Sequence, residues 1–429
     1  MFRVIVTIIL MALVVFPAKA NDVIYRFAKI IDGTGSVLDA RDILISDGLI
    51  KQVGMGVDKT APDASLVDMG SLIALPGLID AHTHITYGLE GESHGNAWAE
   101  LGQVPLSKRL VAGYENGLKT LNTGVTTVRD LNAGENLDYY LRDLINAGAL
   151  KGPRIFTSGA GIHPANEGNR VTEARDRTAE VLALASTRAR EGADWIKFFA
   201  TTGSASDLTS RQQYFEDDFK AAVSVAKQFG LRVTVHSYGP EAVEGAINAG
   251  VNSIEHAVDV PDALLERMAE TGIIYVPTVD HNRYYAAHAD EYGYGDDIQK
   301  NLYDFVARNL ETVKRAHKRG VKIAMGSDAV LSGFGENTCE LRAFVEAGMT
   351  NSEAIQTATI NGAALLGQED RLGRIKAGFV ADIVAVEADP LVDINNLING
   401  VRWVLKEGKI VVPHNNQQRQ QPNCGALKH

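Results

Sequence analysis

The feature that most constrains the fold is a change of pattern after Pro76. From there onward, short apolar segments alternate with longer segments of helical character, many of which end near a glycine. Such alternation is typical of βα units and a parallel sheet. Eight units of this kind predict an α/β chain folded as a (β/α)8 barrel of the TIM type. The expected strands are 78–85, 126–131, 154–159, 195–200, 231–236, 253–257, 273–279 and 321–328.

Both flanks of this region instead show short strand-like segments separated by turns. Examples are "VIYRFAKIID" near the start and "VRWVLKEGKIVV" near the end. We expect residues 21–76 and 371–413 to pack together as one small composite β-sandwich domain, built from both chain ends. It would stand beside a hydrolase barrel of residues 77–370. The polar segment 414–429 predicts a disordered tail.

The first twenty residues predict a secretory signal peptide and no part of the fold. Arg3 precedes an apolar stretch from Val4 to Phe16, and "AKA" at 18–20 has the small-x-small pattern of a cleavage site. The apolar stretch is shorter than the roughly 20 residues that a membrane helix needs. We therefore expect a mature chain that begins at Asn21 and is periplasmic or secreted.

The charge balance limits the partners to be expected. The chain has 53 acidic and 42 basic residues, a formal net charge of −11, and no basic cluster. This argues against nucleic acid or a membrane surface as partner and favours a small-molecule substrate. Cys339 and Cys424 are too few for a disulfide framework, and a single bridge between them stays open at this level.

Ionisable side chains recur where the predicted strands end, which is where barrels of this kind place their active sites. The first strand ends in His-Thr-His, so two imidazoles two residues apart point the same way. Imidazole and carboxylate together suit zinc or a similar divalent metal. A lone strand-end histidine is usually structural, but the coincidence of six such residues favours a metal site. The six are His82, His84, Lys197, His236, His256 and Asp328.

Lys197 is the least expected of these residues. It lies in "WIKFFA", on the strand face shared with Trp195 and Phe199. A lysine is almost never fully buried without a partner. Burial disfavours the charged ammonium and lowers the lysine pKa, so an amine at this position should be reactive.

These segments resemble the amidohydrolase superfamily. The resemblance rests on "PGLIDAHTHI", the fourth-strand lysine, "VTVHSYG", "SIEHAVDV", "MGSD" and the closing "GRIKAGFVADIVAV", and it covers residues 22–413. It implies a metal-dependent hydrolase of C–N bonds in amides and peptides, from the binuclear subgroup in which the lysine is carbamylated. The resemblance then implies two divalent metal ions, with zinc expected. One would be bound by His82, His84 and Asp328, the other by His236 and His256, with N6-carboxylysine at Lys197 between them.

The resemblance also implies a reaction. Two metal ions roughly 3.5–4 Å apart would share a bridging hydroxide that attacks the substrate carbonyl. Asp328 would take the proton from this nucleophile and pass it to the leaving amine. No covalent acyl-enzyme is expected.

Within the superfamily, the chain is most similar to the prolidase-like, Xaa-amino-acid dipeptidase branch and to ochratoxin-hydrolysing amidohydrolases. This implies hydrolysis of the C-terminal amide bond of dipeptides or N-acyl amino acids, including ochratoxin-like amides, by a homo-oligomer. Asp328, Tyr238 and His163 are the candidate catalytic residues, with Tyr238 polarising the carbonyl. The side chains expected to bind the substrate and its free carboxylate are His163, Tyr238, His281 and Arg283.

Two alternatives remain at this level. The same site could act on a cyclic amide, imine or lactone, as an imidazolonepropionase-like enzyme would. The barrel could also be a non-catalytic binding protein. Degenerate barrels usually lose metal ligands, however, and none of the six positions is missing here.

Overall fold

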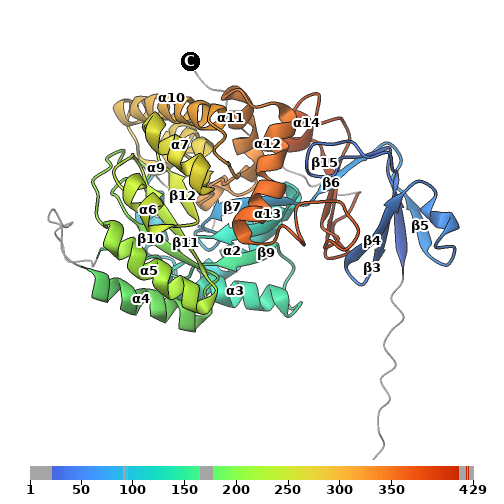
Figure 1. Ribbon diagram of the computed structural model, residues 1–429, viewed down its shortest axis with the longest axis horizontal. Helices are drawn as coiled ribbons and strands as arrows, with labels where there is room; N and C mark the ends of the chain where they lie inside the picture. The colour runs from blue at the N-terminus through green and yellow to red at the C-terminus, as the bar shows by residue number, and fades with distance from the viewer. Residues whose placement is uncertain are drawn as a thin grey trace, which may run out of the picture.

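The computed structural model describes residues 22–89, 93, 95–164, 177–414, 422 and 424. The expected signal peptide and most of the expected tail lie outside these residues. The described chain has a mixed α/β fold in which helices lie around the parallel strands and β3, β4 and β5 project at one side (Figure 1). Within the described part of the chain, no helix is long and apolar enough to cross a membrane.

Seven of the eight expected barrel strands are present as parallel strands. One sheet has three strands in the order β7-β8-β9 and another has four in the order β10-β11-β12-β13. Their bounds are β7 Leu78–Thr83, β8 Val125–Asp130, β9 Arg154–Thr157, β10 Trp195–Phe199, β11 Arg232–Ser237, β12 Ser253–His256 and β13 Ile274–Val276.

The eighth expected strand, 321–328, is not a continuous strand. Ile323 bridges to Tyr275 on β13, and Ala329 bridges to Thr83 on β7. Asp328 between them has a left-handed φ of 50°, which breaks the extended geometry that a strand requires. A further bridge joins Ile162 to Phe198 on β10. The parallel strands therefore form two sheets joined by single bridges, not one continuous eight-stranded barrel.

Helices follow most of the parallel strands and bury the outward-facing strand residues. On β10, Phe198 packs edge-on against Phe219 of α5, with ring centroids 5.6 Å apart, whereas Lys197 faces the opposite side. The helices are α1 Ala97–Leu101, α2 Leu106–Asn122, α3 Leu137–Asn146, α4 Thr178–Glu191, α5 Glu216–Phe229, α6 Val243–Ala249, α7 Asp262–Thr271, α8 Val279–Ala287, α9 Ala289–Tyr292, α10 Asp296–Lys318, α11 Glu340–Glu346, α12 Asn351–Thr357, α13 Ile360–Leu366 and α14 Asn395–Ile398.

The remaining strands form two further sheets, and one of them unites the two ends of the chain. Strand order is β4-β3-β1-β5 in the first and β16-β15-β14-β6-β2 in the second. Side chains of both sheets share one apolar core, in which Tyr25 packs against Trp403 with ring centroids 4.9 Å apart. The bounds are β1 Val23–Arg26, β2 Lys29–Ile30, β3 Asp42–Ser46, β4 Leu49–Gly54, β5 Ser65–Asp68, β6 Ile73–Pro76, β14 Ile383–Val386, β15 Val401–Lys406 and β16 Lys409–Val412.

The expected association of the two chain ends is thus present in the second sheet. The division of the chain into domains at residues 76 and 371 stays a prediction. The cysteine question is answered, because Cys339 and Cys424 form a disulfide with a Cα–Cα distance of 5.4 Å. Arg342 of α11 also donates a hydrogen bond of 2.7 Å to the carbonyl oxygen of Cys424.

Candidate active site

A cavity of about 640 Å³ lies where the parallel strands end. It gathers the six side chains that the sequence analysis singled out as metal ligands. Each of the six residues is at most 9% exposed, so the cavity floor is built from buried ionisable groups. These lining residues are His82, His84, Lys197, His236, His256 and Asp328.

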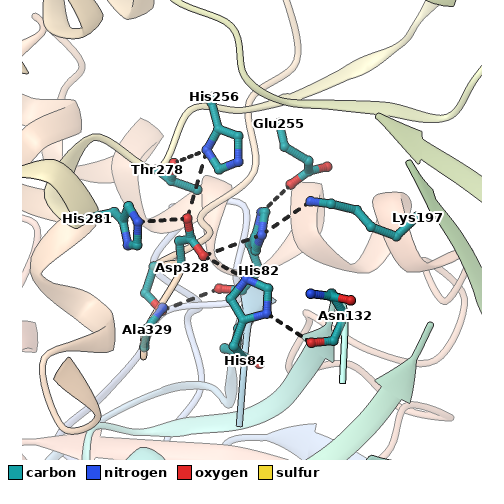
Figure 2. A network of polar contacts seen from close by, with 12 residues as sticks. His82, His84, Asn132, Lys197, Glu255, His256, Thr278, His281, Asp328 and Ala329 are labelled. Atoms are coloured by element: carbon teal, nitrogen blue, oxygen red, sulfur yellow. Dashed lines mark hydrogen bonds and ion pairs between the residues drawn. The ribbon is translucent and has the colours of Figure 1, made fainter. Parts of the chain in front are cut away.

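His82, His84 and Asp328 form one compact group that fits a metal ion. Their ligand atoms all lie within 4.8 Å of one another. Asp328 Oδ1 is 3.0 Å from His84 Nε2 and 3.5 Å from His82 Nε2 (Figure 2). Burial alone would raise the pKa of Asp328, but the surrounding imidazoles hold it well below its usual value. The carboxylate is therefore available as an anionic ligand.

His236 and His256 lie beside this group, with ring centroids 4.5 Å apart. The Nε2 atom of His236 is buried and has no hydrogen-bond partner among the described residues. A buried polar atom without a partner costs free energy, and a metal ion is a partner that suits an imidazole nitrogen. The donor set therefore fits a second metal position.

Lys197 points toward His82, and its Nζ lies 3.5 Å from His82 Nε2 (Figure 2). Burial lowers the pKa of Lys197 to about 8, against the opposing effect of Glu255 and Asp328. The ammonium also lies 5.2 Å from the centre of the Phe199 ring. The sequence predicts a buried lysine with a reactive amine at this position, and the buried side chain with its lowered pKa agrees with that prediction.

Three of the imidazoles are oriented through Nδ1. His82 Nδ1 is 2.7 Å from Oε2 of Glu255, His84 Nδ1 is 3.3 Å from the carbonyl oxygen of Asn132, and His256 Nδ1 is 2.7 Å from Oγ1 of Thr278. For His82 and His84 the partner at Nδ1 can only accept, so it fixes the tautomer and leaves Nε2 as the metal-binding atom. Burial and the nearby Lys197 lower the pKa of His82 to about 4, so its ring is neutral near pH 7.

The residues expected to bind substrate have different locations. Tyr238 lines the cavity, stacks on His236 at 5.3 Å between ring centroids, and accepts a 3.3 Å hydrogen bond from Asn282 at its hydroxyl oxygen. His163 lines the cavity from its exposed side and stacks on Phe199 at 3.8 Å. His281 also lines it, but its Nε2 contacts Asp328 Oδ2 at 3.2 Å.

Arg283 requires a correction, because it does not line this cavity. Its side chain is buried, with Nη1 3.0 Å from Asp280 Oδ1 and Nη2 3.1 Å from Glu346 Oε2. Arg283 is two positions beyond His281 on α8, and on a helix this spacing turns the two side chains to different sides. Arg283 therefore joins α8 to α11 and is not placed to bind substrate there.

Sequence reasoning missed Glu255 and Arg129, which are fully buried beneath the cavity. Arg129 Nη2 donates a 2.8 Å hydrogen bond to Glu255 Oε1, and its guanidinium lies 4.4 Å from the Trp195 ring. Burial would raise the pKa of Glu255, but Arg129 and His82 outweigh it and hold the pKa below its usual range. The only sign of this pair in the sequence is the acidic residue directly before His256, in "SIEH".

Comparisons with known proteins place this geometry in context. The model of the amidohydrolase family matches residues 73–411. Ochratoxinase from Aspergillus niger is 30% identical over 430 residues, covering 91% of this chain and 87% of that protein. Imidazolonepropionase from Streptococcus sanguinis is 24% identical, over 88% of this chain and 91% of that protein. A Xaa-Pro dipeptidase whose structure has methionine bound in the active site is 30% identical in sequence. The two structures match with a TM-score of 0.79 over 91% of this chain and 99% of that chain.

Proposed function

This chain belongs to the amidohydrolase family, and we propose on that basis that it is a binuclear metal-dependent enzyme that hydrolyses the C-terminal amide bond of dipeptides or N-acyl amino acids. That it is a hydrolase of amide bonds follows from its homology to ochratoxinase and to prolidase-like structures. The proposal adds the number of metal ions, the carbamylated lysine and the kind of substrate.

One observation carries the proposal. Four imidazoles, a carboxylate and a lysine of lowered pKa meet in one buried cavity, and one of the imidazole nitrogens has no described protein partner. Such a donor set suits two divalent ions, with zinc expected. When bound, they would supply a Lewis acid for the substrate carbonyl and a water molecule of lowered pKa.

The role of Lys197 follows from its environment. Its neutral amine would add carbon dioxide, forming an N–C bond and releasing one proton, which gives a carbamate with one negative charge. This would convert a buried cation, which is costly, into an anion whose oxygen atoms can serve as metal ligands. Lys197 would thereby supply the ligand shared by the two metal positions.

Asp328 and Tyr238 would handle the proton and the carbonyl oxygen. Asp328 would accept a proton from the attacking water at a carboxylate oxygen and deliver it to the leaving amine. Asn282 donates to the Tyr238 hydroxyl oxygen, so the tyrosine's own proton is available for the substrate carbonyl oxygen. A donor placed at that oxygen stabilises the negative charge that develops there.

The walls of the cavity support a substrate with an apolar and a polar part. Tyr87, Trp98 and Tyr285 provide aromatic surface, whereas Thr201 and Thr202 belong to a polar wall. Among the described lining residues there is no arginine. We therefore assign the free carboxylate of the substrate to His163, because the single hydroxyl proton of Tyr238 serves the carbonyl oxygen.

The proposal extends to architecture and location. The bridges from segment 321–329 to β13 and β7 support a barrel closed by this segment, and the shared core of the other two sheets supports a β-sandwich. The pattern of residues 1–20, which predicts a signal peptide, and the Cys339–Cys424 disulfide both support export to an oxidising compartment. The homo-oligomer stays a prediction that light scattering on the purified protein can test.

The decisive experiment is a panel of dipeptides and N-acyl amino acids assayed with zinc-loaded protein. We expect release of the C-terminal amino acid, about two metal ions per chain, and loss of both in Lys197→Ala. Fewer than one metal ion per chain, together with full amidase activity in Lys197→Ala, would overturn the proposal.

The alternative substrate class is a cyclic amide, imine or lactone, and the similarity to imidazolonepropionase favours keeping it in the panel. Turnover of cyclic amides without any turnover of dipeptides or N-acyl amino acids would establish that alternative. The metal content alone would separate either enzyme from a non-catalytic binding protein.

A further inference from the structure

We propose that Glu255 is a positioning residue that strengthens metal binding at the position shared by His82, His84 and Asp328. The inference rests on the proposed metal site but assigns a role to a residue outside the ligand set. Glu255 is fully buried at the end of β12 and lies 2.7 Å from Nδ1 of His82 through Oε2. Figure 2 shows this contact on the side of His82 away from Asp328.

The carboxylate is itself held firmly. Its Oε1 accepts three hydrogen bonds, 2.8 Å from Arg129 Nη2, 2.5 Å from Thr234 Oγ1 and 2.7 Å from Ser253 Oγ. Arg129 is anchored in turn through Nε, which donates to the carbonyl oxygen of Ala81, next to His82. Because every part of this network is buried, Glu255 cannot move away from His82 without breaking several hydrogen bonds at once.

The partners of the other imidazoles are different. His84 and His256 bond at Nδ1 to a carbonyl oxygen and a hydroxyl oxygen, both neutral. A carboxylate partner makes a stronger, charge-assisted hydrogen bond and raises the basicity of the opposite ring nitrogen. Of these three imidazoles, His82 is therefore the one whose Nε2 becomes the strongest electron donor to a metal ion.

The backbone explains how Glu255 and His256 can serve the same site. Consecutive strand residues normally point to opposite faces. His256 has a positive φ of 68° and Ala257 one of 39°, so the strand ends abruptly at this point. The turn brings His256 to the cavity while Glu255 remains in the interior beneath it.

The test compares the metal affinities of wild type and Glu255→Gln. Metal-free protein is titrated with zinc in competition with a chromophoric chelator, which resolves two binding steps. We expect Glu255→Gln to weaken one step about 10–100-fold and to leave the other within about threefold. Unchanged affinity at both steps, or equal weakening of both, would overturn the inference.

Two further variants separate this role from a general loss of stability. Arg129→Met/Glu255→Gln removes both buried charges, and the weaker metal binding should persist in it. Restoration of wild-type affinity there would mean that Glu255 only neutralises Arg129, which would overturn the inference. Asp42→Asn is the matched control, because Asp42 is a buried partner of Arg26 far from the cavity and should keep wild-type affinity.

The result also distinguishes the inference from the proposed function. If wild-type protein binds metal and hydrolyses amides while Glu255→Gln binds metal equally well, the inference alone fails. If wild-type protein binds no metal, the proposed binuclear site fails as well.

Discussion

Nε2 of His281 lies 3.2 Å from Oδ2 of Asp328, although the two residues come from different strand–helix units. His281 belongs to the first turn of α8, and Glu340 of α11 holds this turn in place through hydrogen bonds to its backbone. The carboxylate of Glu340 accepts hydrogen bonds of 2.9 and 2.7 Å from the N–H groups of Val279 and Asp280. His281 also lines the cavity, so the substrate contact expected from sequence stays a prediction, and we predict in addition that His281 orients Asp328.

Replacing His281 should lower kcat more than it changes KM. In His281→Ala, Asp328 loses a fixed neighbour, and we expect kcat to fall about 10–100-fold with KM nearly unchanged. His281→Gln, which can still donate to Asp328, should recover part of the loss. Steady-state kinetics of the zinc-loaded variants measure both constants. A raised KM at unchanged kcat would show instead that His281 binds substrate.

Metal reconstitution should depend on carbon dioxide and on pH through Lys197. With a pKa of about 8, its amine is neutral in about a tenth of the molecules at pH 7. Since only the neutral amine adds carbon dioxide, the rate of reconstitution at constant dissolved carbon dioxide should rise with pH and level off above pH 8. The metal content of the protein after timed dialysis against zinc measures this rate. A reconstitution rate that does not change with the carbon dioxide concentration would count against the carbamate.

Breaking the disulfide should destabilise the folded protein. The bridge joins residues 85 apart in the sequence, and loss of such a link lowers the free energy of unfolding by about 2–5 kcal/mol. Thermal unfolding of wild type should shift to lower temperature on addition of a reductant. Cys424→Ser should start from the lower temperature and not respond to the reductant. Equal Tm values for oxidised wild type and Cys424→Ser would contradict this prediction.

Arg283 should matter for stability and not for substrate binding. Arg283→Gln removes the cation 3.0 Å from the buried Asp280, whereas Glu346 keeps Arg342 at 3.5 Å. Loss of one member of a buried pair costs about 3 kcal/mol. We expect a lower Tm with KM unchanged. Tyr238→Phe serves as the comparison, because it should keep its Tm and lose kcat/KM. An increase of KM in Arg283→Gln at unchanged Tm would restore Arg283 as a substrate residue.

Pattern reasoning succeeded where the local sequence fixes the direction of a side chain. His82 lies in β7 and His84 one residue beyond its end, so the alternation of an extended backbone predicts their common direction. Seven of the expected barrel strands are present because each is a short apolar segment followed by a helix that covers it. The eighth lost its regular hydrogen bonding at Asp328, whose positive φ has no sign in the sequence.

The sequence by itself determined which strands carry ionisable groups at their ends, and with them the family. Only the tertiary structure decided which buried groups meet. Glu255 reaches His82 from a strand 173 residues away in the sequence, His281 lines the cavity and also contacts Asp328, and Arg283 contacts α11. These contacts depend on the turn at His256 and on how α8 packs, and both are set by the whole fold because long-range packing, not local propensity, fixes them.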